Sequence, residues 1–106
     1  MIFYPKHLFA AGFTPLPWLM FIREDCADNA PLHIHEGIHQ RQMREDWTVV
    51  FWCRYLLSRR WRQRYEVEAY KAQIQAGASL EGCAECLSSM YYLGITYEQA
   101  RQLLKN

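Results

Sequence analysis

Residues 35–39 read His-Glu-Gly-Ile-His, an H-E-x-x-H motif whose residue types and spacing suit metal-assisted hydrolysis. Side chains four residues apart lie on one face of a helix, so the imidazoles of His35 and His39 can share one zinc ion. Glu36, next to the first histidine, can then act as general base for a water molecule. Chance would produce this motif somewhere in the chain with a probability of roughly one per cent, so the pattern favours a zinc site.

The third zinc ligand must come from another part of the chain, because hydrolytic zinc sites usually take three protein ligands. The other two histidines, His7 and His33, both precede the motif. The metzincin pattern also fails, since Gln42 and Glu45 stand where that pattern needs Gly and His. A carboxylate after the motif is therefore the simplest third ligand.

Two carboxylates, Glu66 and Glu68, lie on the helix expected after the motif. Glu66 shares a helix face with Ala69 and Tyr70, and this small, aromatic face can lie close against the motif helix. Glu68 is about 200° around the helix and four residues after Arg64, which is typical of an exposed, charge-paired residue. Helix geometry favours Glu66 as the ligand and keeps Glu68 as the alternative.

The H-E-x-x-H at 35–39, followed by E-x-x-A at 66–69, resembles the gluzincin metallopeptidases. In that family a Glu on a later helix completes the zinc site, often within E-x-x-A-D or E-x-x-A-N, from which Tyr70 departs. The resemblance covers about residues 16–76 and implies a minimal zincin-like core, one zinc ion and a peptide or protein substrate. It also implies that a strand at Trp18–Arg23 holds the substrate backbone along its exposed edge.

Two residues near the expected ligands have roles that the sequence leaves open. Tyr70 either donates a hydrogen bond to His35 or His39 or packs as an ordinary buried tyrosine. Gln42, on the same stripe as both histidines, either orients a ligand, contacts substrate or closes the edge of the core. His33 is about 200° from His35, so we expect it at the surface, outside the site.

The surrounding elements predict an α+β fold, mostly helical, with a small sheet or hairpin near the N-terminus. Strand-forming residues mark one strand, and helical periodicity with turn residues marks the helices that follow. The expected ranges are a strand at 18–23 and helices at 31–45, 47–57, 61–75, 80–93 and 97–104. Asp28 or Asn29, Ser79 and Thr96 are expected N-caps, and Gly77 an expected C-cap.

Length and composition suit a single domain over residues 1–106, because 51% of the residues are hydrophobic. The formal net charge is +1, so we predict no nucleic-acid partner, and an arginine-rich run at 54–64 is expected to be a solvated helix face. Without a membrane-spanning segment or signal peptide, we expect no membrane partner and a cytoplasmic location. A minimal form of this kind would suit a phage or bacterial origin.

The four cysteines are expected to be reduced thiols. Cys83 and Cys86 form a lone C-x-x-C, and a zinc ribbon would need a second pair. We therefore interpret them as small apolar residues of a helix. The sequence supports two functions: a zinc metallopeptidase with Glu36 as general base, or a catalytically silent, zinc-bound interaction domain of the same fold.

Overall fold

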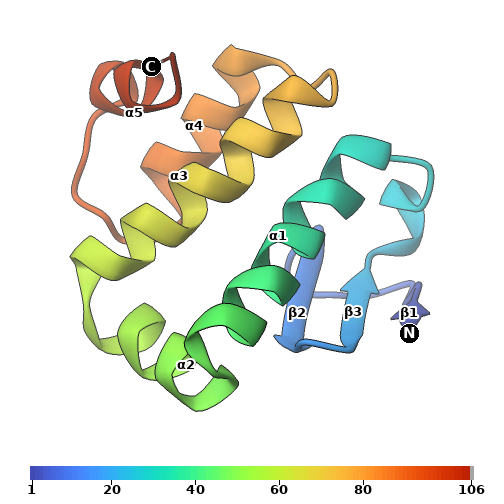
Figure 1. Cartoon of the computed structure of the whole chain (residues 1–106). Coiled ribbons are helices and arrows are strands. Elements are labelled where there is room, and N and C mark those ends of the chain that lie inside the picture. Colours follow the sequence, from blue (N-terminus) through green and yellow to red (C-terminus); the bar gives the residue numbers. More distant parts are fainter. Residues whose placement is uncertain (106) are drawn as a thin grey trace.

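The computed structural model describes residues 1–105, which form a small sheet followed by five α-helices (Figure 1). The predicted α+β, mostly helical fold is confirmed. The strands are β1 (Ile2–Phe3), β2 (Gly12–Leu16) and β3 (Leu19–Ile22), and a 3₁₀ turn follows at Glu24–Cys26. The helices are α1 (Ala30–Asp46), α2 (Thr48–Leu57), α3 (Arg59–Gln75), α4 (Leu80–Met90) and α5 (Tyr97–Lys105).

The helix ends follow the predicted capping residues. Asn29 accepts a hydrogen bond from the backbone N–H of Leu32, and the side chains of Ser79 and Thr96 cap α4 and α5 in the same way. Gly77, with a φ of +112°, follows the end of α3, as a glycine does where the chain turns into the left-handed region. The fourth helix was predicted to reach residue 93 but ends at Met90.

The sheet has the strand order β1-β3-β2, with β1 parallel and β2 antiparallel to β3. The expectation that β3 offers an exposed edge to substrate is therefore wrong, because β3 is the central strand. The strand with a free edge beside α1 is β2, which contains Pro15. Proline lacks a donor N–H, so within sheets it is confined to edge strands, strand starts and bulges, and this residue is the sequence signal for the edge.

The helices stack in layers on one side of the sheet, in the order sheet, α1, α3, and then the α4–α5 pair (Figure 1). The α2 helix crosses one end of α1 and α3 and contacts both. Within residues 1–105, no helix is both long and apolar enough to cross a bilayer. The candidate site lies between α1 and α3, with the sheet on the far side of α1 and the α4–α5 pair on the far side of α3.

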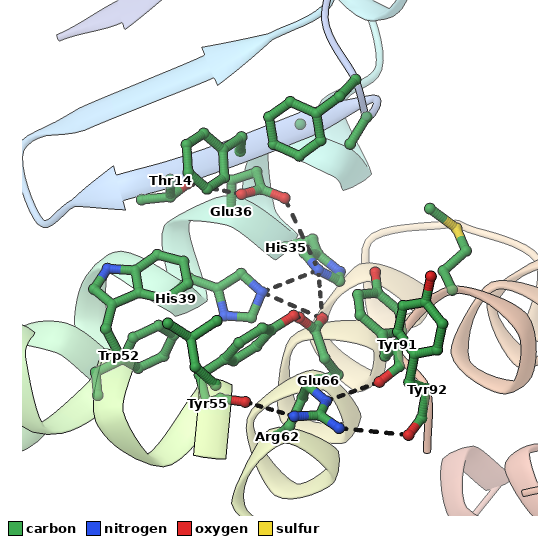
Figure 2. A pocket seen from close by; sticks show the side chains of 17 residues that line it. Thr14, His35, Glu36, His39, Trp52, Tyr55, Arg62, Glu66, Tyr91 and Tyr92 are labelled. Atoms are coloured by element: carbon green, nitrogen blue, oxygen red, sulfur yellow. Dashed lines mark hydrogen bonds and ion pairs between the residues drawn. The ribbon is translucent and has the colours of Figure 1, made fainter. Parts of the chain in front are cut away.

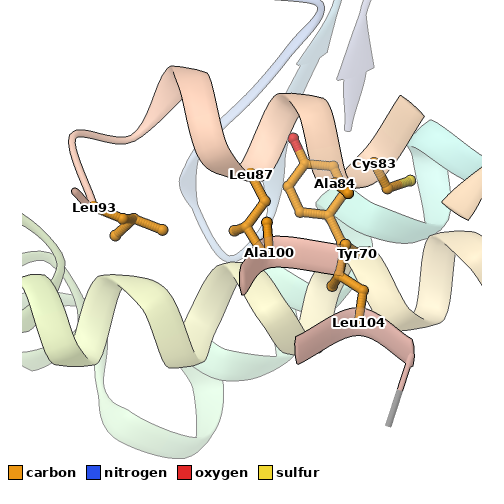
Figure 3. Packing of buried hydrophobic residues seen from close by; sticks show 7 residues of the cluster. All are labelled: Tyr70, Cys83, Ala84, Leu87, Leu93, Ala100 and Leu104. Carbon is orange, nitrogen blue, oxygen red and sulfur yellow. The ribbon is translucent and has the colours of Figure 1, made fainter. Parts of the chain in front are cut away.

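An apolar cluster joins α3, α4 and α5 (Figure 3). Its buried members are Tyr70, Cys83, Ala84, Leu87, Leu93, Ala100 and Leu104. Cys83 is buried there, with Cys86 packed against the cluster, and all four cysteines are free, as the sequence predicted. This cluster packs α4 and α5 against α3, and one of its members, Tyr70, also contacts α1.

Candidate metal centre

Helix α1 buries a polar stripe against α3 instead of an apolar one. His35 and His39 are one turn apart on α1, and each is less than a tenth exposed. Glu66 reaches the same point from α3 and is only 2% exposed. The structure thus brings together the three residues that the sequence predicted as ligands (Figure 2).

The three predicted ligand atoms form a nearly equilateral triangle. The distance between the Nε2 atoms of His35 and His39 is 3.2 Å. Oε1 of Glu66 lies 3.1 Å from Nε2 of His35 and 3.3 Å from Nε2 of His39. Ligands at zinc bond lengths in a tetrahedral arrangement are about 3.3 Å from one another. The triangle therefore has the dimensions of one face of a zinc tetrahedron, with the fourth corner left for water or substrate.

The electrostatics of the cluster favour positive charge at its centre. Burial alone would lower the pKa of His39, but the Glu66 carboxylate attracts its proton and raises that pKa to about 9. Burial alone would raise the pKa of Glu66, yet the two histidines hold it well below its usual range. Two imidazoles and a carboxylate are a donor set that zinc prefers, so the residues fit the ion that the motif predicts.

Gln42 orients His39, which decides between the alternatives that the sequence left open. Its amide nitrogen donates to the carbonyl of Tyr65 and to Glu68, so its oxygen is free to accept from Nδ1 of His39 at 2.8 Å. With the proton fixed on Nδ1, the Nε2 lone pair of the neutral ring faces the centre of the triangle.

Glu68 is exposed, lies behind Gln42 and pairs with Arg41. It is not among the groups that could hold a metal ion in residues 1–105. The predicted exposed, charge-paired character is confirmed, although its partner is Arg41 of α1 and not Arg64 of its own helix. Glu68 therefore supports His39 through Gln42.

Tyr70 packs against His35 and does not take the role of the Asp or Asn that is common at this position. Its ring lies edge-on to the imidazole, with 4.3 Å between ring centroids, and its hydroxyl pairs with that of Tyr91. Nδ1 of His35 is buried and has no hydrogen-bond partner within residues 1–105. The departure at position 70 thus leaves one predicted ligand without the support that Gln42 gives the other.

Glu36 is buried beside the triangle and faces strand β2. Its Oε1 accepts a 2.7 Å hydrogen bond from the hydroxyl of Thr14, and its Oε2 lies 3.9 Å from Nε2 of His35. A Cβ on Gly12 would lie 3.0 Å from both Cγ and Oε2 of Glu36, so a larger residue here would push the carboxylate out of its present position. The sheet therefore sets the position of the predicted general base.

Tyr55 holds the second oxygen of Glu66. Its hydroxyl donates to Oε2, while Oε1 belongs to the triangle (Figure 2). Burial, and then the charge of Glu66, raises the pKa of Tyr55, so the hydroxyl stays protonated and remains a donor. This arrangement presents a single oxygen of Glu66 to an ion.

Thr14, Gly12 and Tyr55 were all missed by sequence reasoning. Their contacts depend on how β2 and α2 pack against the helices that carry Glu36 and Glu66, and local periodicity does not predict this packing. No local sequence pattern marks Thr14 or Gly12. Tyr55 lies in the predicted second helix, but nothing in its spacing pointed to Glu66. His33 is half-buried, forms hydrogen bonds with Tyr4 and with the backbone carbonyl of Asn29, and lies outside the site as predicted.

The triangle opens into a cavity of about 590 Å³. Its polar side is formed by Thr14, Glu36 and the three predicted ligands, and the remainder is aromatic and aliphatic apart from Arg62. The aliphatic and aromatic lining comes from the loop before β2, from α2 and from the segment after α4. Comparisons with models of known families, with characterised proteins and with solved structures found no match to this chain.

Proposed function

We propose that this protein is a zinc-dependent metallopeptidase of the gluzincin type, with His35, His39 and Glu66 as ligands. The observation that carries the proposal is the triangle of ligand atoms with edges of 3.1–3.3 Å, set beside a buried carboxylate at the rim of a cavity. A bound zinc ion supplies a Lewis acid that lowers the pKa of water and polarises a carbonyl group.

Glu36 is the proposed proton carrier of the reaction. Thr14 holds its Oε1, so Oε2 faces the space next to the triangle and can take the proton of the attacking water. The same oxygen then gives this proton to the leaving amine, as a general base followed by a general acid. The absence of a side chain at Gly12 keeps the carboxylate in this position.

Strand β2 is the proposed guide for the substrate backbone. The carbonyl of Ala11 accepts from the N–H of Arg23, so the backbone groups of Ala11 face β3 and those of Gly12 face the free edge. An extended peptide can add to that edge as a further strand, which would bring a peptide bond over Glu36. A side chain of the peptide would then enter the apolar part of the cavity.

A cytoplasmic location also remains a proposal. It is supported by the four cysteines, all of them free thiols, which suit a reducing compartment.

The decisive experiment compares wild type with Glu36→Gln in zinc content and in cleavage of an unstructured protein. We expect both proteins to bind one zinc ion, and the variant to lose cleavage by a factor of about 100 or more. Glu45→Gln, on the exposed side of the same helix, is the matched control and should cleave as wild type does. Equal cleavage by Glu36→Gln and wild type would reject the role of Glu36.

The same experiment distinguishes the alternative function. A wild-type protein that binds one zinc ion and a peptide, but never cleaves it, would be the catalytically silent interaction domain.

A further inference from the structure

Helix α2 is apolar on both of its sides, although only one side is covered. Its inner side packs Phe51, Trp52 and Tyr55 towards the site and the neighbouring helices. A helix that is apolar all round is normally buried on all sides. The opposite side of α2 is nevertheless exposed, and nothing in residues 1–105 covers it.

This exposed side, here called the outer face of α2, is continuous and contains no polar side chain. At 100° per residue its members fill an arc of about 120°. Trp47, which is 78% exposed, extends the arc just before the helix, and Leu57, 85% exposed, ends it. The outer face consists of Trp47, Val49, Val50, Cys53, Leu56 and Leu57.

Arginines stand at both ends of the outer face. Arg44 lies three residues before Trp47, and Arg59 and Arg60 follow Leu57 after a single serine. All three are exposed, and none has a carboxylate within 4.0 Å in the described part of the chain. Residues 41–64 carry seven arginines and two acidic residues, a net charge of +5 in a chain whose total is +1. Because the remainder of the chain carries a net charge of −4, the positive charge is concentrated in the segment that contains α2.

We propose that the outer face of α2 docks on the surface of an anionic lipid bilayer. An apolar helix face with tryptophan and arginine at its ends is the pattern of helices that lie in a membrane interface. The acyl region makes no demand for hydrogen bonds, which suits an arc without polar side chains, whereas protein interfaces carry about one hydrogen bond per 100–200 Å².

The size of the face argues against a second copy of the chain as its occupant. The ten residues of α2 span about 15 Å. A stable protein interface needs about 800 Å² on each partner, more than one side of such a short helix provides. Two copies would also bring their arginines together, whereas an anionic surface attracts them.

This proposal departs from the sequence-based expectation of no membrane partner, which considered only segments that span a bilayer. Here the helix lies along the surface. Leu56 belongs both to the outer face and to the lining of the cavity, so the cavity would open beside the lipid. Docking does not depend on hydrolysis, and its test is independent of the proposed peptidase activity.

The test measures sedimentation of the zinc-loaded full chain with vesicles of phosphatidylcholine, alone or mixed with phosphatidylglycerol. We expect binding to the mixed vesicles, weakening as salt is raised, and little binding to phosphatidylcholine alone. Leu57→Glu should lower the partition coefficient about tenfold or more, and so should Arg59→Gln combined with Arg60→Gln. Both changes are at exposed positions, so circular dichroism should show an unchanged fold.

Trp18→Gln is the matched control, because Trp18 is also a large, exposed apolar residue but lies in the β2–β3 turn. It should bind the mixed vesicles as wild type does. An equal loss with Trp18→Gln would overturn the proposal, and so would a folded wild type that ignores the mixed vesicles. A wild-type dimer that Leu57→Glu converts to a monomer, without vesicle binding, would assign the face to a second copy instead.

Discussion

The contact between α1 and α3 and the contact between α4 and α5 are built on opposite principles. The first buries histidine, glutamine and glutamate side chains, whereas the second buries Leu87, Ala100 and Leu104. Buried polar groups reduce stability unless each finds a partner, and buried charges do so more strongly. We therefore expect the polar α1–α3 contact to contribute less to stability than the α4–α5 cluster behind α3, which supplies apolar burial.

The largest expected effect separates the two glutamates of α3. Glu66→Ala removes a corner of the triangle and should weaken zinc binding on the order of a thousandfold, beyond the roughly 10–100-fold that supporting residues contribute. Glu68→Ala should cost about tenfold or less, because Glu68 acts through Gln42. Zinc competition with a fluorescent chelator measures both, and the reverse order would transfer the ligand role to Glu68.

A substitution in the apolar α4–α5 contact should lower the stability of the protein without changing metal binding. Leu87 is fully buried, so Leu87→Ala should lower the free energy of unfolding by about 2–5 kcal/mol. Urea denaturation measures this loss, and the zinc affinity of the folded variant should equal that of wild type. A weakened zinc affinity would mean that the two contacts are not separate in function.

A methyl group at the sheet edge should disturb the general base without removing the metal. Gly12→Ala should lower the cleavage rate about tenfold with one zinc ion retained, since its Cβ would push the Glu36 side chain away from the site. Gly37→Ala is the matched control, because a Cβ there meets nothing within 4 Å and a helical alanine stabilises by about 1 kcal/mol. Steady-state kinetics on both variants measures the difference, and equal rates would show that the space at Gly12 does not set the position of Glu36.

The smallest expected effect comes from removing the hydrogen bond that orients the His39 ring. Gln42→Ala removes the acceptor for Nδ1 of His39 and should weaken zinc binding about tenfold. Because His35 already lacks such a partner, a variant at position 42 leaves neither histidine oriented by a side chain. Chelator competition measures the change, and an unaltered affinity would show that packing alone orients the ring.

The predictable part of the site is the part that helix geometry determines. Spacing of four residues placed His35 and His39 on one face, and the Ala69 and Tyr70 face of α3 pointed to Glu66 over Glu68. Those inferences needed only the periodicity of two helices, and the structure brings the three residues together.

The contacts that could not be predicted from the sequence all join residues of different helices and strands. Thr14 and Gly12 reach Glu36 from a strand, and Tyr55 reaches Glu66 from the spacer helix. Local patterns did not predict the strand order either. The free edge was therefore assigned to β3, although Pro15 indicated that β2 is an edge strand. The exposed outer face of α2 also could not be predicted, because periodicity does not show which sides of an apolar helix other elements cover.

The most direct test of the account is a crystal of the zinc-loaded protein with anomalous diffraction measured at the zinc absorption edge. We expect one peak about 2.0–2.2 Å from Nε2 of His35, Nε2 of His39 and Oε1 of Glu66. A peak bound elsewhere, or imidazoles that have moved apart with no zinc between them, would contradict it.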